Sequence, residues 1–480
     1  MTDTARRPVD SRWLALVVLC AGMLMIVLDQ TIVNVALPAI QADLGFTQAG
    51  LAWIVNAYLI AFGGLLLLAG RLGDLIGHKR VFVLGLVVFT AASLLCGLST
   101  TPEMLIGARF VQGVGGALST AVTLGMIVKM FPQPKEQAKA IGVFSFVAAA
   151  GASIGLLLGG VLTQGLNWHW IFFVNVPIGV AAVLLASRLI RTEPGIGLGE
   201  GADILGAVLV TGSVMLGVYT IVQAESGGAR TLVLGAVAVA LLVGFVVRQA
   251  KAANPLLPLR VFRSRNVAGA NAVQVLMVAG MFGMFFLGTL YMQFVLHYDA
   301  LRIGLAFLPV AVSIGALSVG FSARLNARFG ERTVLVFGLG LVFVGLLLFV
   351  RAPVDGTYLE HLLPVMLPLG IGVGLSFPAL MTLAMSGATP DDAGLASGLV
   401  NTTAQVGGAL GLAILATTST SRTSRLLAEG VPTPEALTSG FHLAFGISAG
   451  LVALALVVAV TVVRPIAATT AEAPRPMAFH

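Results

Sequence analysis

The chain has 480 residues, of which 58% are hydrophobic and 10% charged, and its formal net charge is +7. Soluble domains carry about 25% charged residues, so this composition excludes a soluble enzyme, a nucleic-acid-binding protein and a disordered scaffold. The apolar runs are continuous over about 20 residues, which excludes a β-barrel with alternating strands of about 10 residues. The fold class is therefore an all-α polytopic membrane protein.

Fourteen apolar runs of membrane-spanning length follow one another along the chain. The first run is longer than the apolar region of a signal peptide, so we expect an uncleaved first span. Most of the 27 Lys and Arg residues fall in loops on the side that holds both termini, and this asymmetry predicts cytoplasmic termini. The predicted spans are 13–37, 51–70, 81–99, 103–128, 140–163, 170–190, 203–222, 231–249, 268–294, 304–323, 333–350, 362–386, 395–416 and 441–463.

The ends of the second and tenth spans resemble each other. The second ends GRLGDLIGHKR (70–80) and the tenth ends ARLNARFGERT (323–333), with Gly77 matching Gly330. This repeat predicts a 6+2+6 arrangement, typical of transporters whose substrate site lies between two halves. The basic stretch 250–267 fits either a segment on the anionic inner leaflet or a plain tether. The predicted division is a tail at 1–12, a six-helix bundle at 13–190, two linker helices with a basic cytoplasmic loop at 191–265, a second six-helix bundle at 266–463, and a tail at 464–480.

Asp29 is the one acidic residue that we place deep inside an apolar span. Ionisable side chains are costly at that depth and are usually functional, which predicts a proton-binding carboxylate. Arg109 in the fourth span is the expected partner, and Gln112 follows it at i+3 on the same helix face. The alternatives are a permanently paired structural carboxylate for Asp29 and a side chain that reaches to the interface for Arg109.

The loop between the second and third spans combines glycines with charge. Its single acid, Asp74, lies among basic residues, so it can pair with a cation or with a helix N-terminus. We interpret the loop as a cytoplasmic conformational latch, and a solvated loop that only follows the positive-inside rule is the alternative. The predicted latch residues are Gly70, Asp74, Gly77, Lys79 and Arg80.

The fifth span carries glycines at i, i+4 and i+8, which form a ridge that lets two helices pack closely. The predicted ridge residues are Gly151, Gly155, Gly159 and Gly160.

Polar, aromatic and methionine side chains inside the spans are candidates for a substrate cavity. The methionines of the ninth span lie near one face, which fits either an adaptable binding wall or plain packing. The predicted cavity residues are Asn34, Trp53, Asn56, Tyr58, Gln274, Met277, Met281, Met284, Tyr291, Asn401 and Gln405.

Five segments in chain order resemble motifs of the major facilitator superfamily. GRLGDLIGHKR is similar to the loop motif G-x-L-x-D-R-x-G-R-K, and the others are LDQTIVNVALP (28–38), LIGARFVQGVGGA (105–117), GASIGLLLGG (151–160) and WHWIFFVNVPIG (168–179). Together they resemble the fourteen-helix drug:proton antiporter family over nearly the whole chain. The chain departs from that pattern at Leu75 and His78, at Leu156 where proline is usual, and at His169 where arginine is usual. His169 is either an interfacial packing residue or a pH-sensitive group.

The resemblance implies proton-driven export of small hydrophobic compounds (drugs, antibiotics or natural products) by alternating access, without a cofactor, and it links Asp29 and Arg109 to proton transfer. A metabolite importer or facilitator, or a lipid-handling transporter, of the same fold is the alternative. No HExxH, Ser-His-Asp or GxxxxGK[ST] pattern is present and the two cysteines offer no metal site, so neither an enzyme nor an ATP-driven pump is expected. The expected partners are the substrate, protons and the lipid bilayer, with no nucleic acid, and we expect a monomer in the bacterial cytoplasmic (inner) membrane.

Overall fold

The protein is described by a computed structural model that covers residues 9–192, 194–195, 197, 203–222, 228–252, 255–256, 259–317, 321–386 and 393–465. These residues form helices joined by short loops, with no strand among them. The α-helices are α1 (Val9–Leu44), α2 (Gln48–Ile76), α3 (His78–Gly97), α4 (Pro102–Met130), α5 (Pro134–Gly165), α6 (Trp170–Phe173), α7 (Asn175–Leu189), α8 (Ile204–Val222), α9 (Ala229–Lys251), α10 (Arg265–Phe294), α11 (Ala300–Ala316), α12 (Ser322–Phe329), α13 (Glu331–Phe349), α14 (Leu363–Met385), α15 (Ala393–Ala428) and α16 (Thr433–Thr461). A 3₁₀ helix (Leu259–Arg263) and a π-helical turn (Tyr358–Leu362) precede α10 and α14.

Eleven of the described helices are long and apolar enough to cross a membrane, and there are twelve if the two parts of α2, which bends by 48°, count as one span. Two shorter apolar helices are Ile154–Gly165, within α5, and Ala300–Ala316. Each of the fourteen apolar runs in the sequence overlaps a helix of this all-helical fold. Parts of the predicted tails (1–8 and 466–480) and of the basic stretch (253–254 and 257–258) lie outside the described residues.

Two helix boundaries differ from the predicted spans for identifiable reasons. The predicted span 170–190 is broken at Val174, between α6 and α7. Pro177 has no N–H to donate to the Phe173 carbonyl four residues earlier, and this missing hydrogen bond favours the break just before it. In the other direction, α15 continues to Ala428, beyond the predicted end at 416. This extension is polar, and the hydroxyls of Thr418 and Thr420 are satisfied within the helix, because they donate to carbonyls one turn back at 2.8 and 2.9 Å.

The internal repeat is visible in how helices pack. The pair α3 and α4 is joined by glycine contacts that recur between α13 and α14. The contacting residues are Gly85 with Gly115 and Ser119 in one half, and Gly338 with Gly372 and Ser376 in the other. The matched glycines Gly77 and Gly330 both have positive φ, 101° and 80°, which favours glycine. The sequence repeat therefore corresponds to a structural one.

A basic residue two positions after each matched glycine makes the same kind of contact. The Lys79 Nζ donates to the Ser187 carbonyl at 2.7 Å, near the end of α7. The Arg332 Nε donates to the Ala459 carbonyl at 3.3 Å, near the end of α16. Cations are stabilised at the C-terminal end of a helix, where free carbonyls carry partial negative charge. The two contacts thus tie α3 to α7 and α13 to α16 in the same way.

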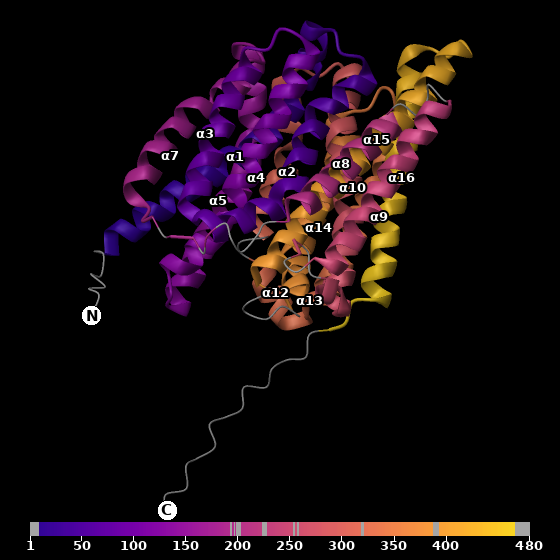
Figure 1. Ribbon diagram of the computed structural model, residues 1–480. Coiled ribbons are helices and arrows are strands. Elements are labelled where there is room, and N and C mark those ends of the chain that lie inside the picture. Colours follow the sequence, from indigo (N-terminus) through magenta and orange to yellow (C-terminus); the bar gives the residue numbers. More distant parts are fainter. Residues whose placement is uncertain are drawn as a thin grey trace, which may run out of the picture.

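Figure 1 shows α1–α7, coloured indigo to magenta, beside α10–α16, coloured salmon to yellow; these two groups are called the first and the second half below. The halves contact each other chiefly through α5 with α11 and α2 with α15. A Cβ on Gly160, near the end of α5, would lie 2.9 Å from the Leu301 Cα at the start of α11. A Cβ on Gly63 would lie 2.6 Å from the Gln405 Cβ. Close backbone approach between halves therefore depends on glycine at both crossings.

The helices α8 and α9 form a hairpin beside the two halves, with α8 packed on α2 and α15. Asp203 precedes α8, and its carboxylate accepts from the Gly206 N–H at 2.9 Å, the Gln249 Nε2 at 2.8 Å and the Arg248 Nε at 3.0 Å. Burial tends to raise the pKa of Asp203, but these hydrogen bonds outweigh it and lower the pKa below its usual 3.8. Asp203 thus holds α8 and α9 together in its ionised form.

Candidate functional site

The first half encloses an ion pair between α1 and α4. The Arg109 Nη1 lies 2.5 Å from the Asp29 Oδ2, and the two side chains are 1% and 0% exposed. The Arg109 Nε donates to the Ile54 carbonyl of α2 at 3.0 Å. The guanidinium also stacks over the Tyr58 ring, with its carbon 4.5 Å from the ring centroid. The guanidinium therefore points into the bundle, and not to the interface.

Gln112 links both members of the pair to α3. Its Nε2 donates to the Asp29 Oδ1 and to the Ser93 hydroxyl, both at 2.8 Å. Its Oε1 accepts from the Arg109 Nη1 at 2.6 Å and from the Cys96 thiol at 3.6 Å. The structure thus brings Asp29, Arg109 and Gln112 together, and adds Ser93 and Cys96, which the sequence analysis did not single out.

Asn175 is a further contact that the sequence analysis missed. Its Nδ2 donates to the Asp29 Oδ1 at 3.2 Å, and the residue is fully buried. Asn175 is the first residue of α7, directly after the break at Val174. The available signal was a lone amide in an apolar run, two residues before a proline that interrupts the helix.

The ion pair holds one carboxylate, a group that can take up a proton, in a site shielded from solvent. Among the described ion pairs, it is the one in which both side chains are buried. Burying an isolated charge is very costly, so the carboxylate and the guanidinium stabilise each other. Protonating Asp29 would leave Arg109 with its Ile54 and Gln112 partners. The described residues hold no group of three or more His, Cys, Asp or Glu that could bind a metal ion.

The predicted latch loop makes one weak ion pair. The His78 Nε2 lies 3.5 Å from the Asp74 Oδ1, and the Asp74 side chain is 50% exposed. No ion pair between Asp74 and Lys79 or Arg80 occurs in the described part of the chain. Lys79 instead binds α7, and Arg80 is exposed. Surface pairs of this kind contribute up to about 1 kcal/mol.

The glycines of the loop have different surroundings. Gly77 provides the sharp turn between α2 and α3 with its φ of 101°. Gly70 is open, because a Cβ there would meet nothing within 4 Å. The last turn of α2 is contacted by the segment after α7, since the Gly197 N–H donates to the Leu75 carbonyl at 3.1 Å.

The predicted glycine ridge lies where α5 crosses α1. A Cβ on Gly155 would lie 2.9 Å from the Leu28 carbonyl, and one on Gly159 would lie 2.8 Å from the Ile32 carbonyl. Gly151 packs against Leu24 one turn earlier, so the two helices run in the same direction. The adjacent Gly160 faces α11, so the ridge joins α5 both to its own half and to the second half.

Several predicted cavity residues lie in other surroundings. Trp53 faces the linker helix α8, where its ring centroid is 6.4 Å from that of Tyr219. The Tyr291 hydroxyl donates to the Pro353 carbonyl at 2.5 Å within an aromatic cluster of the second half. Tyr58 belongs to the ion-pair site, and the Asn34 Nδ2 donates to a carbonyl on its own helix at 3.2 Å.

The remaining cavity residues fall into two sets. The methionines are at most 6% exposed, which fits packing inside the second half; they are Met277, Met281 and Met284. The second set has buried polar atoms without a described hydrogen-bond partner; its members are Asn56, Gln274 and Gln405. Asn401 is half-buried on α15. Unpartnered buried amides are rare, so the second set contains the better candidates for polar substrate contacts.

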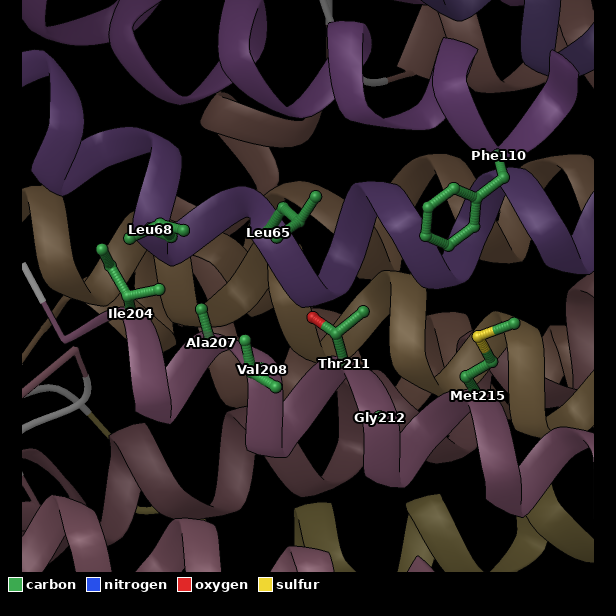
Figure 2. A pocket seen from close by; sticks show the side chains of 9 residues that line it. All are labelled: Leu65, Leu68, Phe110, Ile204, Ala207, Val208, Thr211, Gly212 and Met215. Atoms are coloured by element: carbon green, nitrogen blue, oxygen red, sulfur yellow. The ribbon is translucent and has the colours of Figure 1, made fainter. Parts of the chain in front are cut away.

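A pocket of about 290 Å³, open to the surface, lies between α2, α4 and α8. Figure 2 shows its lining, which comprises Leu65, Leu68, Phe110, Ile204, Ala207, Val208, Thr211, Gly212 and Met215. The Thr211 hydroxyl is its one polar side-chain group, and that oxygen has no described partner. None of the predicted cavity residues lines it.

His169 lies at the end of the bundle where α1 and α3 finish. Its Nδ1 is 2.9 Å from the Gly97 carbonyl, which requires a proton on that nitrogen. Its ring stacks on Trp168 with centroids 3.8 Å apart, and the Trp168 Nε1 donates to Asp43 at 2.9 Å. The His169 Nε2 is 3.8 Å from the same carboxylate. Packing between α1 and α3 is a sufficient role for this residue.

The family profile and the similar sequences agree on the family of this chain. A sequence profile described as Major Facilitator Superfamily matches residues 19–412. A puromycin resistance protein of Streptomyces alboniger is 39% identical over 94% of this chain and 91% of its own length. A cephamycin export protein of Amycolatopsis lactamdurans is 39% identical over 86% of each chain. A tetracenomycin C resistance and export protein of Streptomyces glaucescens is 34% identical over 85% of this chain and 76% of its own length.

Comparison with solved structures shows the same fold. The crystal structure of a bacterial homologue of the human lysosomal transporter Spinster, inward-facing and unoccupied, superimposes with a TM-score of 0.66. It is 15% identical and the match covers 94% of this chain and 97% of that one.

Proposed function

Because the chain belongs to the major facilitator superfamily, we propose that it exports small hydrophobic compounds of the antibiotic and natural-product class in exchange for protons. Membership of that family makes it a multi-pass membrane transporter, and not an enzyme. Its relatives are named as resistance and export proteins for puromycin, cephamycin and tetracenomycin C, and these names support export over uptake.

The buried ion pair is the observation that carries the proton coupling. Asp29 is fully buried and its carboxylate accepts from three side chains, Arg109, Gln112 and Asn175. A carboxylate inside a membrane protein is costly unless it has a function. We assign the coupled proton to Asp29, with Arg109 and Gln112 as the groups that stabilise its ionised form.

The internal repeat supports a single proton site. Arg109 lies six residues before Gly115, and six residues before the matched Gly372 stands Met366, which is fully buried. The second half thus has an apolar side chain where the first half has the guanidinium. We propose that the first half carries the proton and that the second half contributes chiefly apolar surface to the substrate.

Alternating access fits the way the halves meet. The α5–α11 contact at Gly160 lies at the end of the bundle away from the start of α1, because α5 runs parallel to α1. We propose a 6+2+6 arrangement of fourteen spans with cytoplasmic termini, in which this contact closes the outer side. The loop at Asp74 is proposed as the matching latch on the inner side, where Lys79 already ties α3 to α7.

The single buried carboxylate limits the substrate. An unpaired buried charge costs several kcal/mol, and Arg109 already opposes Asp29. We therefore propose neutral, zwitterionic or monocationic hydrophobic substrates, and not dications. A panel of matched monocationic and dicationic dyes, run beside neutral antibiotics, tests this limit, because strong export of the dications would contradict it.

Everted membrane vesicles test the function itself. The vesicles should accumulate a neutral substrate when their interior is acidic, and a protonophore should abolish the accumulation. Accumulation that requires an acidic exterior instead would favour an importer of the same fold. Accumulation without a proton gradient would contradict antiport.

A further inference from the structure

Asn175 differs from the other groups bonded to Asp29. It is fully buried, and its Nδ2 donates to the Asp29 Oδ1 at 3.2 Å. The other end of its amide, the Oδ1, is buried without a hydrogen-bond partner in the described part of the chain. The nitrogen must face Asp29 while the acid is ionised, because an amide oxygen would be repelled by a carboxylate oxygen.

The remaining partners of Asp29 cannot accept a hydrogen bond from its O–H group when the acid is protonated. Arg109 has only donors. The Gln112 amide is fixed, because its oxygen already accepts from Arg109 at 2.6 Å and its nitrogen donates to Ser93 at 2.8 Å. The Ser93 hydroxyl is used as well, since it donates to the Phe89 carbonyl at 2.8 Å. A protonated Asp29 would therefore face donors on every side unless one of them turned.

We propose that Asn175 is a two-way positioning residue, whose amide donates to the ionised Asp29 and turns by half a rotation to accept the O–H of the neutral acid. This inference rests on the proposed role of Asp29 as the proton carrier. The step forms one O–H bond on the Asp29 Oδ1 when the proton arrives and breaks it when the proton leaves, with no other covalent change.

The turn of Asn175 breaks no protein hydrogen bond except the one to Asp29. Before the turn the unpartnered atom is the amide oxygen, and after it the unpartnered atom is the amide nitrogen, in the same place. Rotation of an amide about its last torsion is soft. The titratable groups that face Asp29 are Arg109 from α4, Tyr58 from α2 and Cys96 from α3. The Cys96 thiol donates to Gln112, so it does not replace Asn175 as the acceptor.

Difference infrared spectroscopy on the full-length protein tests the proposal. Acidification should produce a carboxylic C=O band that is absent in Asp29→Asn, at the frequency of an acid that donates a hydrogen bond. In Asn175→Leu, which has a similar shape without polar atoms, that band should move to the frequency of a free acid. The matched control is Asn271→Leu. Asn271 is a buried asparagine of the second half whose amide is bonded at both ends, to Val267 at 2.8 Å and Thr403 at 2.9 Å. The control should leave the Asp29 band in place.

A second measurement needs no change at Asn175. With the asparagine side-chain carbonyls labelled with ¹³C, acidification of the wild type should shift one amide band, and this shift should be absent in Asp29→Asn. An Asp29 acid band whose frequency is the same in Asn175→Leu, with no amide shift in the wild type, overturns the role of Asn175 and leaves the proposed function intact. The absence of any Asp29 band across the pH range of transport overturns both.

Discussion

The Asp29–Arg109 pair yields the sharpest mutational prediction. Asp29→Asn leaves Arg109, whose side chain is 1% exposed, without its counter-charge. Breaking a buried ion pair by removing one partner costs about 3–5 kcal/mol. Arg109 keeps the Ile54 carbonyl and the Gln112 oxygen. We therefore expect a loss of about 3 kcal/mol in the free energy of unfolding, together with a complete loss of proton-driven export.

The double variant Asp29→Asn/Arg109→Gln separates stability from coupling. It leaves no charge in the site, and two uncharged side chains of similar volume remove the cost of the unpaired buried guanidinium. We expect its stability to return to within about 1 kcal/mol of the wild type, while proton-driven export stays absent. Thermal unfolding in detergent can be followed with a thiol-reactive dye, because both cysteines, Cys20 and Cys96, are buried in the folded protein.

Transport is measured in everted vesicles with an imposed pH gradient. A double variant that regains its stability and also exports against the gradient would refute the reasoning, because the pair would then serve the structure alone. If Asp29→Asn were as stable as the wild type, the expected cost of the unpaired guanidinium would be contradicted.

Three further predictions concern other parts of the molecule. Gly155→Ala places a Cβ 2.9 Å from the Leu28 carbonyl and should destabilise the protein by about 1–3 kcal/mol. The control Gly107→Ala, whose Cβ would meet nothing within 4 Å, should stabilise it by up to about 1 kcal/mol, and equal unfolding midpoints of the two variants would contradict the ridge. Asp74→Asn should shift the balance of inward and outward states, seen as altered labelling of introduced cysteines on both faces, and unchanged labelling would leave Asp74 as ordinary loop surface. The pKa of Asp203 is lowered in the folded protein, so the ionised carboxylate stabilises the fold above the unfolded pKa of 3.8, and this stabilisation is lost as the pH falls through the folded pKa. Asp203→Asn should remove this acid-dependent loss and lower the stability at neutral pH by about 1–3 kcal/mol. An unchanged dependence of stability on pH would contradict the assignment.

The sequence was most informative where a residue type was out of place. A lone acid in an apolar run predicted Asp29, and the spacing of Arg109 and Gln112 predicted a shared helix face. The structure brings these three side chains into contact. Their proton-coupling role stays a prediction.

Residues that lie on unbroken helices and could face several directions were harder to place. Periodicity does not say which neighbour a helix face will meet, so it could not predict that Trp53 faces α8 or that Tyr291 lies in an aromatic cluster. Asn175 escaped notice because its contact with Asp29 depends on a helix break and on the packing of α7 beside α1. Such contacts join residues 146 positions apart and have no local signature.

The most direct test of the central claim is proton release on substrate binding, measured with a pH indicator in weakly buffered detergent solution. If substrate and proton compete through Asp29, binding of a neutral substrate to the protonated wild type should release about one proton per substrate, by linkage. The Asp29→Asn/Arg109→Gln variant should bind substrate and release none. Equal proton release from that variant, or binding to the wild type without any release, would contradict the account.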